Sequence, residues 1–168
     1  SHDRLTGLPN RSLIQVRIAE ALKRAKVNHS LVGALFIDLD NFKTINDTLG
    51  HEMGDVLLVE VAKRIQRTIR PSDIAARLGG DEFVVILENT HDLDAGEAIA
   101  RRLSEQFARP FQLGDDLRIV TASIGIALSD ERDTEPSDIL RKADVAMYQA
   151  KKEGKAGFST FNSSMTMK

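Results

Sequence analysis

Apolar residues recur three or four positions apart in four long segments of the chain, which is the pattern of helices with one buried face. These segments are residues 12–25, 53–69, 94–107 and 136–152. The stretch 41–49 predicts a shorter helix that Gly50 closes. We therefore expect five helices distributed along the chain.

Short apolar runs lie between the helical segments and predict strands. Residues 31–37 are almost continuously apolar, which is typical of a central strand buried on both faces. Residues 74–77 and 84–87 flank a glycine pair and predict a hairpin whose two-residue turn is Gly79-Gly80. The remaining strand-like stretches are 111–113 and 117–128, which together predict a second hairpin, and 158–161, which predicts a closing strand.

The order of these elements predicts an α+β fold. Two hairpins interrupt any run of parallel strands, so we expect helices packed against a mixed sheet. The 168 residues, 42% of them hydrophobic, are enough for a single domain with one sizeable core. We expect this core to span about residues 3–160 and residues 162–168 to form a short, polar, flexible tail.

Charge and composition exclude several classes of protein. The formal net charge is −2, so the chain lacks the general basic field that holds polymeric nucleic acid. The absence of cysteine excludes disulfide scaffolds and thiolate zinc sites, and it fits a cytoplasmic location. No apolar run approaches the roughly 18 to 20 residues of a membrane-spanning helix, so any membrane anchor would belong to another part of the protein.

Carboxylates gather at two predicted strand ends. Asp38 and Asp40 follow the central strand and share a face, whereas Asp81 and Glu82 stand behind the glycine pair. If the strands are neighbours, Asp38 and Asp81 meet in a site of hard oxygen ligands, which favours Mg²⁺ or Mn²⁺ bound together with a nucleoside triphosphate. Two such ions recur in enzymes that transfer nucleotidyl groups. Two alternatives stay open: the aspartates could cap the helix that begins at residue 41, and the glycine pair could form an ordinary turn.

Phosphate groups need cations, and the chain has no P-loop motif to supply them. Lys43 follows the acidic strand end, and three lysines close the last helix, namely Lys151, Lys152 and Lys155. Each of these side chains could equally be a solvated surface residue. The lysines therefore become candidates for phosphate binding only in combination with the acidic site.

Several motifs surround these residues in a fixed order. They are Asp3 to Arg11 (DRLTGLPNR), Phe36 to Lys43 (FIDLDNFK), Asn46-Asp47, Gly50-His51 to Gly54-Asp55, Gly79 to Phe83 (GGDEF), Ala122 to Ile126 (ASIGI), and Ala143-Asp144 through Tyr148 to Lys151. In these motifs the chain resembles the GGDEF domain of diguanylate cyclases, from about residue 3 to residue 155. The resemblance implies a fold like the palm of nucleotide polymerases and class III nucleotidyl cyclases, with a mixed, mostly antiparallel sheet flanked by helices.

The resemblance also implies a reaction, in which two molecules of GTP become cyclic di-GMP and two molecules of pyrophosphate. Asp38, Asp81 and the carbonyl of Leu39 would hold Mg²⁺, two ions per site, and Mn²⁺ can substitute. Glu82 would support the metal and the reacting 3′-hydroxyl. The residues that would bind the substrate are Asn46 and Asp55 at the guanine base, Lys43, Lys151 and Lys155 at the triphosphate, and Gly79 and Gly80, against whose backbone the triphosphate would lie.

The chain departs from the family pattern after the last helix. The family usually has arginine where Lys155 stands and asparagine where Ala156 stands. The positive charge is kept, but the two-pronged hydrogen bonding of arginine is lost. We expect weaker triphosphate binding rather than inactivity.

A second family feature is an Arg-x-x-Asp sequence five residues before the glycine pair, which implies product binding and inhibition. Arg70 and Asp73 match this sequence. Arginine suits such a site because it can clamp the guanine and phosphate of an intercalated cyclic di-GMP dimer. Arg101 or Arg102 could complete this site. The alternative is that Arg70 is simply an arginine at the end of a helix.

Each such site would hold one GTP, so the reaction implies a homodimer in which two domains face each other. We expect an N-terminal sensor domain to impose that geometry in the full-length protein, and the isolated domain to be mostly monomeric. Residues 158–165 resemble the stretch that leads into a C-terminal EAL phosphodiesterase domain in tandem proteins. The alternative function is therefore a catalytically silent module that binds GTP or cyclic di-GMP and regulates such a domain. A polymerase-like domain acting on nucleic acid is disfavoured, because a basic groove and stacking aromatic residues are missing.

Overall fold

The computed structural model describes residues 1–165, so part of the predicted tail, residues 166–168, lies outside the described residues. The helices are α1 (Arg11–Asn28), α2 (Phe42–Leu49), α3 (His51–Thr68), α4 (Asp94–Phe107) and α5 (Pro136–Lys152). The strands are β1 (Leu31–Leu39), β2 (Ile74–Gly79), β3 (Glu82–Thr90), β4 (Phe111–Leu113), β5 (Asp116–Arg118), β6 (Ala122–Leu128) and β7 (Phe158–Thr160). No helix within residues 1–165 is long and apolar enough to cross a membrane.

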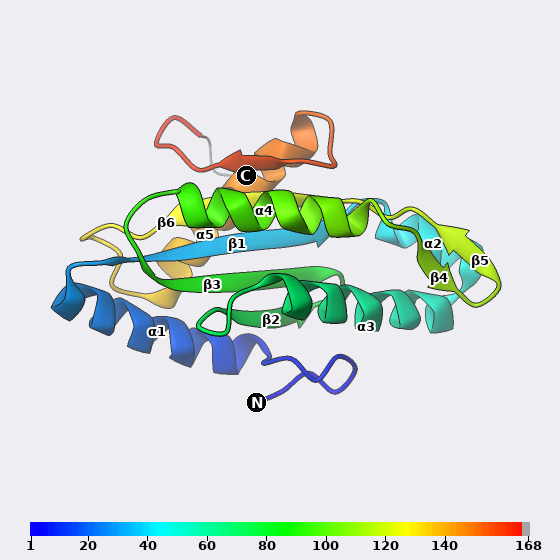
Figure 1. The fold of residues 1–168 in the computed structure, drawn as a ribbon, viewed down its shortest axis with the longest axis horizontal. Helices are drawn as coiled ribbons and strands as arrows, with labels where there is room; N and C mark the ends of the chain where they lie inside the picture. Colours follow the sequence, from blue (N-terminus) through cyan, green and yellow to red (C-terminus); the bar gives the residue numbers. More distant parts are fainter. Residues whose placement is uncertain (166–168) are drawn as a thin grey trace.

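The central strand of the main sheet is β1. The sheet has the order β2-β3-β1-β6-β7, in which only the β6–β7 pair is parallel, and β4 and β5 form a separate two-stranded sheet (Figure 1). The predicted α+β fold with a mixed, mostly antiparallel sheet is therefore confirmed.

Helices cover both faces of the main sheet, and alternate residues of β1 supply both cores. Val32, Ala34 and Phe36 pack with the apolar residues of α1 and α5 on one face. Leu35 and Ile37 pack with α3 and α4 on the other face. Because both faces are buried, β1 is apolar at nearly every position, which is why its sequence shows a continuous run rather than an alternation.

The predicted strand 117–128 is not continuous. The chain forms β5 up to Arg118 and enters the main sheet as β6 at Ala122. Leu117 and Ile119 are 65% and 58% exposed, whereas Val120 is buried in the core. The apolar run therefore combines two exposed positions with buried ones, and the chain leaves the small sheet between them.

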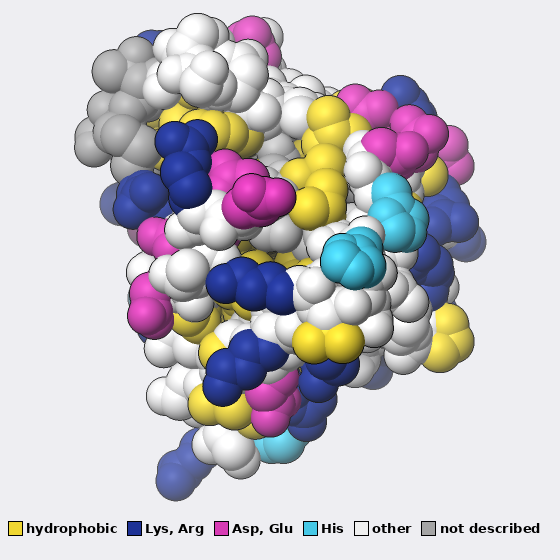
Figure 2. All heavy atoms as spheres, turned by 90° about the vertical axis from the view of Figure 1, so that its left-hand side faces the viewer, with side chains coloured by type: hydrophobic (Ala, Val, Ile, Leu, Met, Phe, Trp, Pro, Cys, Tyr) yellow, Lys and Arg dark blue, Asp and Glu magenta, His cyan; other side chains and the backbone are white. Residues whose placement is uncertain are grey.

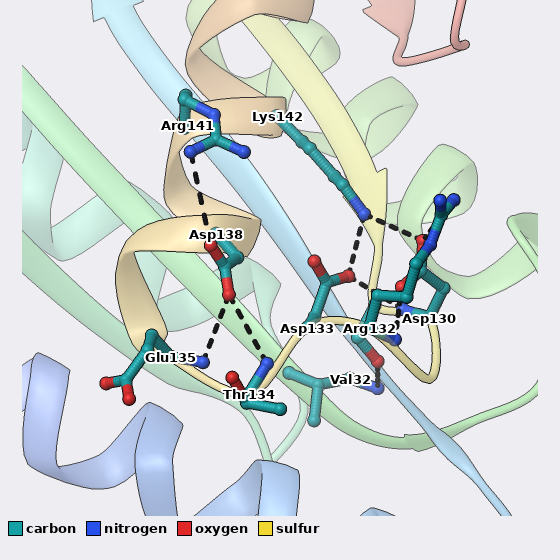
Figure 3. Close-up of polar contacts among 10 residues, drawn as sticks. Val32, Asp130, Arg132, Asp133, Thr134, Glu135, Asp138, Arg141 and Lys142 are labelled. Atoms are coloured by element: carbon teal, nitrogen blue, oxygen red, sulfur yellow. Dashed lines mark hydrogen bonds and ion pairs between the residues drawn. The ribbon is translucent and has the colours of Figure 1, made fainter.

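The loop between β6 and α5 is fixed by ion pairs. Lys142, on α5, places its ammonium group 2.7 Å from a carboxylate oxygen of Asp133 and 3.1 Å from one of Asp130 (Figure 3). The carboxylate of Asp138 accepts hydrogen bonds from the backbone N–H groups of Thr134 and Glu135 where α5 begins. These bonds set the position of α5, whose opposite end carries Lys151.

Helix α5 lies unusually close to β6 at Gly125. A Cβ atom at this position would overlap with the carbonyl oxygen of Ala143 and the amide nitrogen of Met147, which are backbone atoms of α5. Backbone atoms cannot rotate away as a side chain can, so glycine is required by the helix-to-sheet contact itself.

We predict that Gly125→Ala lowers the free energy of unfolding by about 3 kcal/mol or more, because α5 must move away from the sheet. Urea denaturation of the purified domain measures this change. Gly33→Ala, on the neighbouring strand β1, is the matched control, since its Cβ would meet only the Leu87 side chain at an ordinary distance of 3.4 Å. Equal unfolding midpoints for the two variants would contradict the prediction.

Candidate active site

The ends of β1 and of the β2–β3 hairpin bring the predicted carboxylates together. In the register of β1 with β3, Asp38 lies opposite Glu82. The backbone N–H of Leu39 points to the carbonyl of Asp81 at an N···O distance of 3.4 Å, and the side chains of Asp38 and Asp81 are hydrogen-bonded to each other. Two carboxyl groups from distant parts of the sequence thus share one site at the end of the central strands.

The hairpin turn differs from the predicted one by one residue. Gly79 pairs with Glu82, so the two turn residues are Gly80 and Asp81 rather than Gly79 and Gly80, and a register shift lies between Arg77 and Gly79. Both glycines have positive φ angles, 142° and 49°, which explains why both positions need glycine. The shift places Asp81 at the tip of the turn.

Arg77 holds this turn in place, which the sequence analysis missed. Its guanidinium donates two hydrogen bonds, of 2.9 and 2.8 Å, to the carbonyl oxygen of Gly80. A third nitrogen lies 2.9 Å from a carboxylate oxygen of Asp3, which in turn binds the backbone and hydroxyl of Thr6. The N-terminal DRLT sequence is therefore connected to the GGDEF turn through one arginine.

The two carboxyl groups have too little positive charge around them to ionise together. Burial, the hydrogen bond that protonated Asp38 donates to Asp81, and the negative charge of Asp81 raise the pKa of Asp38 to about 8, although the charge of Lys151 acts in the opposite direction. The Lys151 ammonium lies 3.8 Å from Asp38. The pair therefore retains a proton at neutral pH unless a cation binds.

Asp40 is buried and serves as an anchor. Its carboxylate accepts hydrogen bonds from the hydroxyls of Thr121 and Ser123, both at 2.7 Å, and from the backbone N–H of Ala156 at 3.0 Å. The Lys151 ammonium lies 3.3 Å away. Burial by itself would raise the pKa of Asp40, but these bonds and the charge of Lys151 hold it below its usual value.

The proposal that Asp40 caps a helix is wrong. The N-cap residue of α2 is Asn41, in the left-handed conformation, and its side chain makes no capping hydrogen bond. Asp40 instead ties the end of β1 to the start of β6 and to the segment after α5. The sequence signal for this role was the alternation of Asp38 and Asp40, which places both carboxylates next to Lys151.

The other two lysines predicted to bind the triphosphate, Lys43 and Lys155, are exposed on the surface near the carboxylate site. Lys43 is exposed and forms an ion pair with Asp47 at 2.8 Å. Lys155 is exposed, has a positive φ of 64°, and donates a hydrogen bond of 2.9 Å to the side chain of Asn41. Only Lys151 contacts the carboxylates directly, and the other two stand where their ammonium groups can turn toward a ligand.

Asn46 and Asp55 lie on consecutive helices that meet at Gly50. Asn46 belongs to α2, and its side-chain oxygen is buried with no hydrogen-bond partner. Asp55 is exposed on α3 and lines a cavity of about 530 Å³ together with Leu5 and Val56. The Asn46 amide lies against Gly54, the residue before Asp55, so an amide and a carboxylate are available near each other for a base that carries both donors and acceptors.

Arg70 and Asp73 form a tight pair away from the carboxylate site, just before β2. The Arg70 guanidinium lies 2.8 Å from the Asp73 carboxylate, whose side chain is fully buried, while the arginine side chain is 41% exposed. Arg70 also lines a cavity of about 280 Å³ with Arg24, a residue the sequence analysis did not select. The buried acid therefore orients an arginine whose outer edge faces solvent.

The two α4 arginines considered for the same site differ in position. Arg101 lies over the ring of Phe158 at 5.6 Å, and Phe158 belongs to β7, at the edge of the sheet opposite to β2. Arg102 is exposed at the next position of α4.

Hard divalent cations fit the carboxylate site. Asp38 keeps its proton because too little positive charge surrounds it. Carboxylate oxygens such as those of Asp38 and Asp81 are the ligands that Mg²⁺ and Mn²⁺ prefer. Within residues 1–165, no three His, Cys, Asp or Glu side chains converge as a complete metal centre. A cation held by Asp38 and Asp81 would therefore need further ligands from the backbone or from a bound phosphate.

Charged side chains are also present at the opposite end of the molecule, where Lys142 pairs with Asp130 and Asp133. Figure 2 shows that face, with acidic and basic side chains interspersed over the surface. The end of β1 differs from this face because two acids, Asp38 and Asp81, lie against each other there.

Comparisons with known proteins agree with this site. Residues 1–157 match the family model described as "Diguanylate cyclase, GGDEF domain". The chain is 43% identical over 164 residues to the bifunctional diguanylate cyclase/cyclic di-GMP phosphodiesterase MucR of Pseudomonas aeruginosa, a match that covers 98% of this chain and 24% of MucR. It is also 43% identical over 155 residues to the diguanylate cyclase TpbB of the same species, covering 92% of this chain and 36% of TpbB. The chain thus spans well under half the length of these curated relatives.

Solved structures show the same fold. A truncated form of TpbB that comprises only the GGDEF domain superimposes with a TM-score of 0.92 at 40% identity, covering 96% of this chain and 95% of that chain. The coiled coil and GGDEF domain of DgcB from Caulobacter crescentus, in complex with c-di-GMP, gives a TM-score of 0.84 at 29% identity, covering 95% of this chain and 85% of that one.

We predict that Asp38→Asn stabilises the metal-free domain at alkaline pH. Folding raises the pKa of Asp38 from 3.8 to about 8. The free energy of unfolding of the metal-free protein is therefore highest below pH 3.8, and it declines as the pH rises from there through about 8. In the presence of a chelator, the variant should gain more than about 2 kcal/mol over the parent at pH 8.5 and little at pH 4, since one pKa unit corresponds to about 1.4 kcal/mol.

Thermal and urea unfolding with a chelator measure this difference, and added Mg²⁺ should stabilise the parent but not the variant. Glu131→Gln is the control, since it removes an exposed acid in the loop at the other end of β1. If Asp38→Asn were less stable than the parent at pH 8.5, the claim that ionised Asp38 and Asp81 destabilise the metal-free protein would be wrong.

Proposed function

Since this chain belongs to the diguanylate cyclase GGDEF domain family, we propose that it condenses two molecules of GTP into cyclic di-GMP and two molecules of pyrophosphate. The observation that carries this proposal is the direct contact between Asp38 and Asp81, with Lys151 alongside. A cation and a triphosphate would supply the opposite charges that this cluster lacks. The surrounding motifs of the family are present in order, apart from the departure at Lys155 and Ala156.

In this proposal, the carboxylates of Asp38 and Asp81 and the carbonyl of Leu39 would hold Mg²⁺, two ions per site, with Mn²⁺ as a substitute. Bound metal would stabilise the negative charge that develops on the transferred phosphoryl group and on the leaving pyrophosphate. Glu82 follows the turn on β3, opposite Asp38, where it supports the metal site and the 3′-hydroxyl that reacts.

Each condensation step exchanges one bond for another. The 3′-hydroxyl oxygen of one GTP bonds to the α-phosphorus of the second GTP, and the bond between that phosphorus and the oxygen bridging to the β-phosphate breaks. The hydroxyl loses its proton, and pyrophosphate leaves with the electron pair. A second step with the roles of the two nucleotides reversed closes the ring.

The lysines and glycines position the triphosphate. Lys151 is already held between Asp38 and Asp40, so its charge is fixed at the edge of the site. Lys43 and Lys155 are exposed and can exchange their present partners for phosphate oxygens. Gly79 and Gly80 present bare backbone at the turn, against which phosphates can lie.

Asn46 and Asp55 read the guanine base. The carboxylate of Asp55 accepts from the two N–H donors of the Watson–Crick edge of guanine, and the amide of Asn46 serves the remaining polar groups. Asp55 is exposed near the start of α3, where its carboxylate is open to a ligand.

Two copies of the domain must face each other, because each site binds one GTP and both bonds join different nucleotides. Precise alignment of the two substrates then contributes to the rate, since well-aligned reactions recover on the order of 7 to 11 kcal/mol of the barrier. The chain spans 24% and 36% of MucR and TpbB, and we propose that an N-terminal sensor segment supplies the alignment in the full-length protein. DgcB, whose GGDEF domain is joined to a coiled coil, offers a parallel.

The second candidate function is a silent module that binds GTP or cyclic di-GMP and regulates an attached EAL phosphodiesterase domain. Similarity to PdeR of Escherichia coli favours it, because this relative, 41% identical over 166 residues, is named as a cyclic di-GMP phosphodiesterase alone. The complete set of acidic and guanine-reading residues in this chain favours the cyclase instead.

We predict that the domain, fused to a dimerising coiled coil and incubated with GTP and Mg²⁺, produces cyclic di-GMP detectable by mass spectrometry. Asp81→Ala should reduce the initial rate by at least about a thousandfold, because it removes a ligand of the transferring group. Glu131→Gln should leave the rate unchanged. GTP binding without product in the parent protein would favour the regulatory module.

We further propose that Arg70 and Asp73 bind the product and inhibit the enzyme. Arg70→Ala should weaken product inhibition by about tenfold or more while the initial rate stays within about twofold, because the pair lies before β2 and away from the carboxylate site. Initial rates at increasing cyclic di-GMP concentrations test this. The control is Arg67→Ala, which removes an exposed arginine from the same end of α3. Inhibition that persists in Arg70→Ala would reject the assignment.

A further inference from the structure

The side-chain amide of Asn46 rests on the backbone of a glycine. A Cβ atom on Gly54 would overlap with the side-chain oxygen of Asn46 and would lie 3.1 Å from the amide carbon. It would also lie 3.5 Å from the ring of Phe42, which closes the same space. The position of this amide therefore depends on the absence of a side chain at residue 54.

Backbone hydrogen bonds fix the two residues relative to each other. Gly50 ends α2 and precedes α3, and its φ of 91° lets the chain change direction there. Its N–H donates to the carbonyl of Asn46 at 2.9 Å, and its carbonyl accepts from the N–H of Gly54 at 3.1 Å. Asn46 and Gly54 are thus both hydrogen-bonded to Gly50, on either side of it in the sequence. This arrangement places the Asn46 side-chain amide against the backbone of Gly54.

The buried end of this amide is unsatisfied. Among the residues that the structure describes, the Asn46 side-chain oxygen is the one buried side-chain oxygen or nitrogen without a hydrogen-bond partner. Rotating the amide by 180° would bury its NH₂ group instead and leave two donors without partners, which costs more. The oxygen therefore faces Gly54, and the NH₂ group is the end left for a ligand.

We infer that Gly54 is a specificity-determining residue of the nucleotide site, which acts by positioning the Asn46 amide so that its NH₂ group faces an acceptor of guanine. This inference rests on the proposed function. Asp55, the next residue of α3, supplies the complementary acceptor, so the pair Gly54-Asp55 sets both halves of base recognition. Gly54 touches no substrate and is a positioning residue.

The variant Gly54→Ala separates this role from a structural one. The atom it displaces is the end of a flexible side chain, so the fold can accommodate the new methyl group by moving the amide. Alanine also favours a helix more than glycine does, so the unfolding midpoint should not fall. A protein that is as stable as the parent but has lost guanine preference is the expected signature.

Binding can be measured without turnover by using 3′-deoxy-GTP and 3′-deoxy-ATP with Mg²⁺, since neither carries the hydroxyl that reacts. Isothermal titration calorimetry on this domain should show Gly54→Ala binding the guanine nucleotide about tenfold more weakly, the loss expected for one hydrogen bond, with little change for the adenine nucleotide. Asn46→Ala should show the same loss, and the double variant should lose no more than Asn46→Ala alone. Gly33→Ala, far from the site on β1, is the control.

Unchanged guanine preference in Gly54→Ala would overturn the inference, and so would a loss that adds to that of Asn46→Ala, because Gly54 would then act independently of the amide. A parent protein without any preference for the guanine nucleotide would instead overturn the proposed function, and this inference with it. The two failures are therefore distinguished by the behaviour of the parent.

Discussion

The register of β1 between β3 and β6 is the constraint on which the site depends. Asp38 lies opposite Glu82 on one side and opposite Ser123 on the other. A slip of one residue on either side would turn the apolar residues of β1 from one core to the other, so packing on both faces fixes the register. The same register that buries Leu35 and Phe36 therefore brings Asp38 to Asp81 and Asp40 to Ser123.

The polar end of the sheet is less favourable for stability than its apolar middle. Asp38 is short of positive charge, and Lys155 and Ala156 have positive φ angles of 64° and 52°, which side chains rarely adopt. Asp40 offsets part of this cost, because its fully satisfied carboxylate binds the N–H of Ala156 and holds the strained segment against β1. The close contact of α5 with Gly125 fixes the helix that leads into this segment.

The elements with strong periodicity could be predicted from the sequence, and so could the meeting of Asp38 and Asp81, because each residue ends a strand that the pattern identifies. The turn was placed one residue too early, since a register shift after Arg77 leaves no trace in the apolar pattern. The contact between Arg77 and Asp3 joins residues 74 positions apart, and polar contacts over such distances depend on packing that local patterns do not encode. Arg24, beside Arg70, was missed for the same reason: on its helix it reads as a solvated arginine.

Charge explains why the same residues that limit stability are suited to binding. Asp38, Asp81 and Glu82 act on one another as negative charges, while only Lys151 among the predicted lysines stands close enough to oppose them. Lys43 and Lys155 are committed to weaker, exposed partners that a phosphate could replace. A cation at the carboxylates would attract the phosphates, and the phosphates would in turn draw in the exposed lysines. Metal and nucleotide binding should therefore reinforce each other, because each supplies the charge that the other lacks.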